Sequence, residues 1–194
     1  MRSAPSTIDL GHVYVLDLLG DVGIDMLRTV LSFDAALRGR RANHGAEDPP
    51  RVLVRIASRG GETDTAAAIH EALTLMPAEI VTLGFGSVSS AAVIVFCAGK
   101  MRLLTAGTRV VYHAPRWNPE GSYTVEEQQR VLTVSERRFE LAAQILSGTT
   151  GTSVQQMERD LAAGLVFSAE EAVAARIATT AVECLRFEPQ ALGA

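Results

Sequence analysis

Short apolar runs rich in β-branched residues alternate along this chain with segments whose apolar residues recur at helical spacing. The first pattern is typical of buried strands and the second of helices. Because a helix that links two strands usually returns them to one sheet in parallel, this order predicts an α/β fold with a mainly parallel sheet and helices outside it. The predicted strands are 12–18, 51–57, 79–85, 101–105, 109–113 and 177–183. The predicted helices are 21–38, 65–76, 90–98 and 124–147, and two more begin at Ser153 and Ser168. The predicted loops or turns are 38–50, 58–63, 86–89 and 114–123.

Three of the predicted strands end in residues that suit acyl-transfer chemistry. Strand 51–57 runs into SRGG, strand 79–85 runs into GSVSS, and strand 109–113 ends in His113. Carboxyl ends of parallel strands gather at one edge of a sheet, so a glycine pair, a serine and a histidine can meet there. Acyl transfer needs a nucleophile, a base within hydrogen-bond reach and donors for an oxyanion. The order of these segments therefore favours a hydrolytic site at that edge.

Three serines at this edge compete for the role of nucleophile. Ser87 and Ser89 fall in the predicted turn, whereas Ser90 heads the helix predicted at 90–98. A residue at that position lies at the positive end of the helix dipole, which stabilises negative charge. A structural role as a helix N-cap is the alternative for Ser90.

Backbone N–H groups near Ser90 are the candidate oxyanion donors. The N–H of Ala91 is one of the donors at the start of a helix that have no partner within it. Gly60 and Gly61 carry no side chain, so they can turn their N–H groups toward a ligand. A tight turn between strand and helix is the alternative reading of the glycine pair, and it is compatible with the first.

The helix predicted at 124–147 carries apolar residues around much of its girth, and such a helix needs burial. The pattern favours an interface with other subunits over packing within its own domain alone. The apolar positions are Val131, Leu132, Val134, Phe139, Leu141 and Ile145.

Composition narrows the class of protein. The chain has 194 residues, 47% of them hydrophobic and 21% charged, with a net charge of −4. The charge gives no general attraction to nucleic acid or to an anionic membrane. Neither cysteine, Cys97 nor Cys184, has a metal-ligand partner at short spacing, so no metal site is predicted. The N-terminus lacks a signal-like apolar run, and the apolar run 91–98 is too short to span a bilayer. These features predict a soluble cytoplasmic protein.

Four ordered blocks resemble the proteolytic subunit of the Clp-type protease, within the wider Clp/crotonase superfamily. They are SRGGETDTAAAIHEAL (58–73), GSVSSAAVIVFCAG (86–99), RVVYHAP (109–115) and FSAEEAVAARIA (167–178). The resemblance extends over roughly 12–183. It implies an α/β superhelix of β-β-α units with a protruding handle helix. It further implies a single domain over 1–194, with a head at roughly 1–113 and 164–194 and a handle at roughly 114–163.

The resemblance also implies roles for individual residues. Ser90 matches the family's nucleophile, with Ser89 as the alternative, and His113 matches its general base. The oxyanion hole falls on the N–H groups of Gly61 and Ala91. This mechanism uses no metal and no cofactor. The other histidines belong to no matched block and are expected to be non-catalytic, namely His12, His44 and His70.

The chain departs from the family in three places. The family's third catalytic residue, an aspartate, falls on Gly164, so Asp160, Glu158, a carbonyl group or nothing at all takes its place. The loop at 114–123 lacks the family's glycine-rich strand. A short N-terminal segment and an insertion at 39–50 argue against docking to an AAA+ unfoldase ring, although the resemblance allows one.

Three functions remain open from the sequence. The first is a serine peptidase that cleaves peptides or unfolded polypeptides through a Ser90–His113 acyl-enzyme. The second is a non-catalytic or weakly active ring subunit, which the glycine at 164 favours. The third is a crotonase-like acyl-CoA enzyme, in which Ser90 and His113 would have no clear role. The resemblance implies that copies of the chain assemble into seven-membered rings, either single or stacked in pairs.

Overall fold

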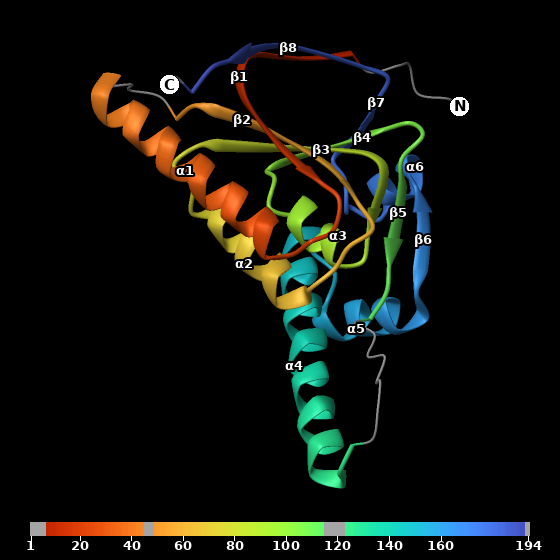
Figure 1. Cartoon of the computed structure of the whole chain (residues 1–194). Helices are drawn as coiled ribbons and strands as arrows, with labels where there is room; N and C mark the ends of the chain where they lie inside the picture. The colour runs from red at the N-terminus through yellow and green to blue at the C-terminus, as the bar shows by residue number, and fades with distance from the viewer. Residues whose placement is uncertain (1–6, 45–48, 115–122, 193–194) are drawn as a thin grey trace.

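The computed structural model describes residues 7–44, 49–114 and 123–192, which form one sheet with helices packed on it (Figure 1). The strand order is β6-β5-β3-β2-β1-β8, with β4 paired to β3 and β7 paired to β4. Every strand pair is parallel except β5 with β6, so the predicted α/β class is confirmed. The strands are β1 (Thr7–Leu19), β2 (Arg51–Ser58), β3 (Glu79–Ser89), β4 (Met101–Thr105), β5 (Arg109–Tyr112), β6 (Leu165–Ser168), β7 (Thr180–Val182) and β8 (Cys184–Gln190). The helices are α1 (Ile24–His44), α2 (Thr63–Thr74), α3 (Ala91–Phe96), α4 (Val125–Thr150), α5 (Val154–Ala163) and α6 (Ala169–Ala174).

The central strands are apolar on both faces because both faces are covered. Along β2, Val52 and Val54 belong to the large cluster under the helices, whereas Leu53 belongs to a second cluster on the other face. Successive side chains of a strand point to opposite faces, so a continuous apolar run fits a strand buried on both sides. This burial fixes where β2 and β3 end, and the site lies at those ends.

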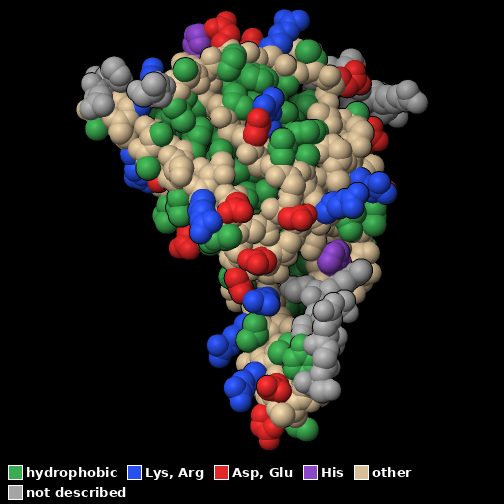
Figure 2. All heavy atoms as spheres, viewed as in Figure 1, with side chains coloured by type: hydrophobic (Ala, Val, Ile, Leu, Met, Phe, Trp, Pro, Cys, Tyr) green, Lys and Arg blue, Asp and Glu red, His purple; other side chains and the backbone are tan. Residues whose placement is uncertain are grey.

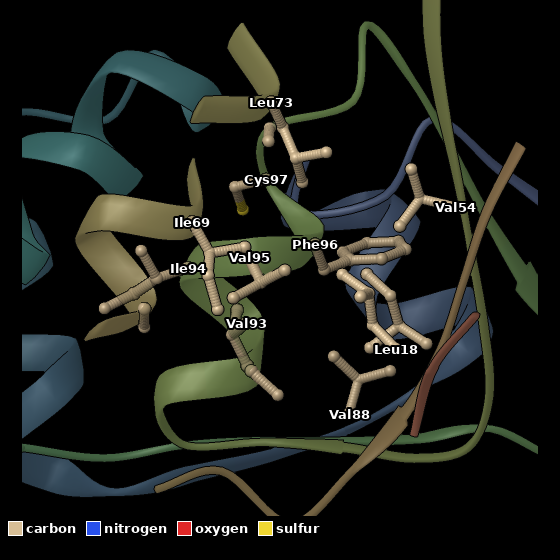
Figure 3. Packing of buried hydrophobic residues seen from close by; sticks show 14 of the residues in the cluster. Leu18, Val54, Ile69, Leu73, Val88, Val93, Ile94, Val95, Phe96 and Cys97 are labelled. Carbon is tan, nitrogen blue, oxygen red and sulfur yellow. The ribbon is translucent and has the colours of Figure 1, made fainter. Parts of the chain in front are cut away.

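Helix α3 is buried along its whole length and lies inside the helical layer. Figure 3 shows Phe96 pointing toward Leu18 and Val54, while Ile94 lies on the other side of α3. The Thr82 hydroxyl donates a hydrogen bond to the Phe96 carbonyl at 2.8 Å and so satisfies a group at the end of the helix. The residue at the head of α3 is therefore held by a close-packed core.

The predicted loop at 38–50 is wrong over its first part, because α1 continues to His44. A glycine inside a helix costs about 1 kcal/mol relative to alanine, so Gly39 alone does not end it. Arg38 pairs with Asp34 one turn earlier, and Arg41 donates to the Pro77 carbonyl at 2.8 Å. The first contact lies within α1, and the second attaches the end of this helix to the turn after α2. Residues 45–48 of the predicted loop lie outside the described residues, as do residues 115–122 of the loop predicted at 114–123.

The predicted turn at 86–89 is also wrong, because β3 continues to Ser89. The strand bends at Gly86, where φ is 65°, and changes partner there. Before the bend it pairs with β4, and after it Ser87 to Ser89 pair with β5. The sequence patterns did not predict β6 and β8. Both are edge strands whose side chains are half exposed or exposed, so they lack a buried apolar run.

Helix α4 extends away from the rest of the chain (Figure 1). Its first turn carries the expected capping box, in which the Thr124 N–H donates to Glu127 at 2.8 Å and the Glu127 N–H donates to Thr124 Oγ1 at 3.2 Å. Only its C-terminal half is buried, through Ala142, Ala143 and Leu146 among others. Figure 2 shows hydrophobic side chains among charged ones along the projecting part. Within the described part of the chain, no helix is long and apolar enough to cross a membrane.

Candidate active site

Ser90 lies at the junction of β3 and α3 in a backbone conformation that is rare for any residue except glycine, with φ 53° and ψ −127°. Such a conformation costs on the order of 1–3 kcal/mol and is found mostly at functional sites. Strand β5 holds it in place, because the Ser90 N–H donates to the Val111 carbonyl at 2.8 Å. The hydroxyl makes no cap hydrogen bond to α3, so the alternative role as a side-chain N-cap is not fulfilled.

The turn between β2 and α2 packs directly against Ser90. Gly60 has φ 103°, and a Cβ built on it would lie 2.7 Å from the Ser90 Cβ and 2.7 Å from the Ser89 carbonyl oxygen. A side chain at position 60 is therefore excluded by both backbone conformation and space. The Ser58 hydroxyl accepts the Gly60 N–H at 3.0 Å and secures the turn.

Gly61 is held by a short bridge to Val22. The Val22 N–H donates to the Gly60 carbonyl at 2.8 Å, and the Glu62 N–H donates to the Val22 carbonyl at 2.9 Å. The N–H groups of both neighbours, Gly60 and Glu62, therefore have acceptors, namely Ser58 and Val22. The Gly61 N–H has no acceptor among the described residues. The Ala91 N–H, in the first turn of α3, has no acceptor within the described ranges either. Both predicted oxyanion donors are thus available.

His113 follows β5 and lines, together with Ser90, two cavities that meet at this point. Its Nδ1 lies 2.7 Å from the Ala114 carbonyl oxygen. A carbonyl can only accept, so this contact places a proton on Nδ1. The Ala114 N–H donates to the Leu161 carbonyl of α5 at 2.8 Å, which fixes the position of that residue. The contact thus orients the ring and selects the tautomer with Nδ1 protonated.

No carboxylate of the described residues hydrogen-bonds to His113. Gly164 ends α5 in the left-handed conformation, and a Cβ built on it would lie 3.8 Å from the His113 Cβ. Position 164 is therefore beside the His113 side chain, but glycine supplies no acid. The Asp160 carboxylate accepts from Gln156 Nε2 at 2.8 Å, and among the described residues Glu158 makes no hydrogen bond to His113. The group that occupies the orienting position is the Ala114 carbonyl.

Cys97, Tyr112 and the other described histidines are unsuited to proton transfer at this site. Burial raises the pKa of the Cys97 thiol to about 12, so this cysteine stays neutral. Burial also raises the pKa of Tyr112, whose hydroxyl donates to Met157 Sδ. Burial lowers the pKa of His70, which lines neither cavity, and His12 pairs with Glu188 on exposed strands. The side chain of His44 lies outside the described residues.

The larger cavity, of about 1110 Å³, is a groove between the glycine turn and α4. Its lining combines apolar side chains with charges of both signs, with Arg59 and Glu62 on one side and Arg130 on the other. Arg138 of α4 crosses to Asp64 of α2 with an Nη2–Oδ2 distance of 2.6 Å. Sequence patterns could not find this ion pair, because its partners are 74 residues apart and both are half exposed. Such a groove can hold an extended main chain.

No group of three histidine, cysteine, aspartate or glutamate side chains in the described ranges could hold a metal ion. The arrangement instead combines a strained serine, free backbone donors and an oriented imidazole. These are the elements of nucleophilic acyl transfer.

Comparison with known proteins gives a consistent result. Residues 45–182 match the family described as Clp protease. The chain is 30% identical over 132 residues to ATP-dependent Clp protease proteolytic subunit 1 of Leifsonia xyli subsp. xyli, covering 66% of each chain. It is 30% identical over 131 residues to ATP-dependent Clp protease proteolytic subunit 2 of Frankia casuarinae, covering 66% of this chain and 59% of that one. It is 29% identical over 178 residues to ATP-dependent Clp protease proteolytic subunit 3 of Rhodococcus jostii, covering 86% of each. The chain thus spans somewhat less than two thirds of the first two relatives.

Proposed function

Because the chain belongs to the Clp protease family, we propose that it is a serine peptidase that cleaves peptides or unfolded polypeptides through an acyl-enzyme on Ser90. The observation that carries the proposal is the strained Ser90, which lines the same two cavities as His113. In support, the N–H groups of Gly61 and Ala91 have no acceptor among the described residues. The Ser90 hydroxyl makes no cap hydrogen bond to α3. The strained conformation is explained if this hydroxyl must face the groove.

In this mechanism the Ser90 oxygen bonds to the carbonyl carbon of the scissile peptide, and the hydroxyl proton passes to Nε2 of His113. The carbonyl π electrons move to the oxygen, which the N–H groups of Gly61 and Ala91 stabilise. Collapse of this intermediate breaks the C–N bond, and the amine leaves with the proton from His113. A water molecule then repeats the sequence on the ester, releasing the carboxylic acid and restoring Ser90.

The Ala114 carbonyl takes the place of the triad acid in this proposal. Like a carboxylate, it fixes the tautomer and the orientation of the His113 ring. Unlike a carboxylate, it carries no full charge to stabilise the imidazolium that forms during the reaction. We therefore expect a slow peptidase whose weakest step is the proton transfer through His113.

The test of this function is covalent labelling with a simple alkyl fluorophosphonate, read by intact mass. The assembled wild-type protein should gain one adduct, and peptide mapping should place it on Ser90. Ser90→Ala should gain none, whereas Ser89→Ala, which removes the neighbouring hydroxyl, should still be labelled. A folded wild-type protein that takes no adduct, or an adduct that persists in Ser90→Ala, would contradict the proposal.

A non-catalytic ring subunit is the second candidate, and the glycine at position 164 is the observation that favours it. The two candidates predict opposite results for the labelling test. For a crotonase-like enzyme the structure gives no specific support.

We further propose that the chain acts in the cytoplasm as one domain, with a head at roughly 1–113 and 164–194 and a handle at roughly 114–163, and that its copies assemble into a ring. The support is the projecting half of α4, where Val125 and Leu132 lie seven residues apart on one face and are exposed in the single chain. A helix with such a face needs a partner to cover it. An AAA+ unfoldase remains a further partner that the family suggests.

The assembly proposal makes its own prediction. The double variant Val125→Lys and Leu132→Lys should shift the protein to a smaller species in size-exclusion chromatography with light scattering, because two charges would be buried without partners. Thr133→Lys, which adds charge to the same helix at an already polar exposed position, should leave the size unchanged. Equal sizes for both variants and the wild type would contradict an interface on this face.

A further inference from the structure

The backbone on either side of Gly61 is held by one residue of a distant segment, Val22, which lies between β1 and α1. The Val22 N–H donates to the Gly60 carbonyl at 2.8 Å, and the Val22 carbonyl accepts the Glu62 N–H at 2.9 Å. In a parallel bridge of this kind Val22 uses both of its backbone groups on the partner segment, whereas Gly61 directs both of its own groups away from it.

The hydrogen bond to the Gly60 carbonyl determines where the Gly61 N–H points. This carbonyl and this N–H belong to the same peptide unit, which is trans, as are all the units that the structure describes. In a planar trans unit the C=O and N–H bonds point in opposite directions. Because Val22 holds the carbonyl on its own side, the N–H must point away from Val22. Gly61 is exposed and lines the groove, so its N–H is open to a substrate there.

The bridge between Val22 and Gly61 is out of register with the sheet. Strands β1 and β2 pair with Leu19 opposite Ala57, and the bridge follows with Val22 opposite Gly61. Between these two pairs the first segment has two residues and the second has three, so the second segment carries a bulge. Bulges redirect backbone and side chains and are frequent beside active sites. Without the extra residue, the Gly61 N–H in place of the Glu62 N–H would donate to the Val22 carbonyl and would be lost to a substrate.

Close contacts keep the glycine turn in this arrangement. A Cβ built on Gly61 would collide with the Val22 carbonyl group, and one built on Gly60 would lie 2.7 Å from the Ser90 Cβ and 3.1 Å from the Ala91 nitrogen. The turn is therefore in contact both with Val22 and with the head of α3. The Val22 side chain is only 2% exposed and belongs to the large core cluster, so the core fixes the position of the donor that holds the turn.

We infer that the backbone N–H of Val22 aims and strengthens the oxyanion donor at Gly61, which makes Val22 a positioning residue for acyl transfer. A carbonyl that accepts a hydrogen bond polarises its peptide unit, so the N–H of the same unit becomes a stronger donor. The inference rests on the proposed peptidase function, because it concerns a donor that only the proposed reaction uses.

The test removes the Val22 N–H and measures how well the oxyanion is stabilised. The α-hydroxy acid analogue of valine, introduced at position 22 by in vitro translation, replaces the N–H with an oxygen atom and keeps the side chain. The substrates are a peptidyl phenyl ester and the matching thionoester, in which sulfur replaces the carbonyl oxygen. In both, the Ser90 oxygen bonds to the acyl carbon, the phenoxide leaves, and the serine proton reaches it through His113 as phenol. Sulfur accepts hydrogen bonds weakly, so the ratio of the two kcat/KM values reports the contribution of the oxyanion donors.

The wild type should prefer the oxygen ester, and the hydroxy acid at position 22 should reduce this preference at least about tenfold, mainly through kcat. Rates are expressed per active site, counted from the end point of fluorophosphonate labelling, so that unfolded protein does not contribute. Val22→Pro removes the same N–H by ordinary mutagenesis and should change the ratio in the same direction. Val22→Ala keeps the N–H and loses only packing, so it should change both rates by the same factor and retain the wild-type ratio.

The matched control is the α-hydroxy acid analogue of glycine at position 20. It removes another backbone hydrogen bond of the same segment, from the Gly20 N–H to the Ala57 carbonyl at 3.1 Å. This bond does not involve the peptide unit between Gly60 and Gly61, so its loss should leave the preference for the oxygen ester at the wild-type value.

The outcomes separate the inference from the function on which it rests. If the fluorophosphonate labels Ser90 but the hydroxy acid at position 22 leaves the ratio unchanged, Val22 does not position the donor and the peptidase proposal stands. If the hydroxy acid at position 20 lowers the ratio as much, the bond to Gly60 has no special role and the inference is overturned. If the fluorophosphonate fails to label Ser90, the proposed function fails and the inference fails with it.

Discussion

Replacing Gly164 with aspartate should raise the rate of serine labelling and of peptide cleavage by about a hundredfold or more. A Cβ at this position would lie 3.8 Å from the His113 Cβ, so a carboxylate built on it is within reach of the imidazole. That charge would stabilise the imidazolium, which the Ala114 carbonyl does only weakly. The left-handed backbone at 164, with φ 68°, is one that aspartate and asparagine tolerate better than other side chains.

The matched control for this gain is Gly164→Asn, which has the same shape and the same backbone tolerance but no charge. It should show little or no gain. The acidic limb of the pH–rate profile should lie at higher pH in Gly164→Asp than in Gly164→Asn, because a neighbouring carboxylate favours the protonated ring. Equal rates and equal profiles for the two variants would mean that charge beside His113 does not limit the reaction.

Replacing Gly60 with alanine should reduce labelling of Ser90 by at least about a hundredfold, since a displacement of the order of 1 Å can cost that much. The added methyl group would lie 2.7 Å from both the Ser90 Cβ and the Ser89 carbonyl oxygen, so Ser90 or the turn must move. The expected damage is to the position of the nucleophile rather than to the global fold. Labelling and thermal unfolding should be measured on the same samples.

The control variant Gly20→Ala adds the same backbone strain as Gly60→Ala without a steric clash against Ser90. Gly20 has φ 88°, close to the 103° of Gly60, but a Cβ there meets nothing within 4 Å. Both variants should lower the unfolding temperature, whereas only Gly60→Ala should lose labelling. Comparable labelling in the two variants would show that contact between the glycine turn and Ser90 is unnecessary.

The sequence predicted the end of β2 to within one residue, whereas the end predicted for β3 was four residues short. Continuous apolar runs such as 51–57 are typical of strands buried on both faces, and the order of the glycine turn, Ser90 and His113 along the chain followed from them. The end of α1 was missed because Gly39 and the arginines around it look like a loop. Arg38 and Arg41 in fact bind carbonyl groups after α2, 37 and 36 residues away. Contacts between residues so far apart in the sequence cannot be predicted from the spacing of apolar residues within one segment.

The chemistry of the site was only partly predictable for the same reason. The residue types of a nucleophile, a base and two donors are visible in order along the chain. Which group orients His113 depends on where the Ala114 carbonyl points, and that is set by a hydrogen bond to Leu161, far along the sequence.

The burial of Cys97 at the far end of α3 from Ser90 gives the protein a built-in reporter of how firmly its nucleophile is held. A thiol reagent can reach this sulfur only when α3 or its surroundings open, whereas the exposed Cys184 on β8 reacts from the folded state. The ratio of the two modification rates therefore measures the free energy of local opening around the reactive serine. This measurement needs no substitution in the chain, because the modification rate of Cys184 serves as the internal reference.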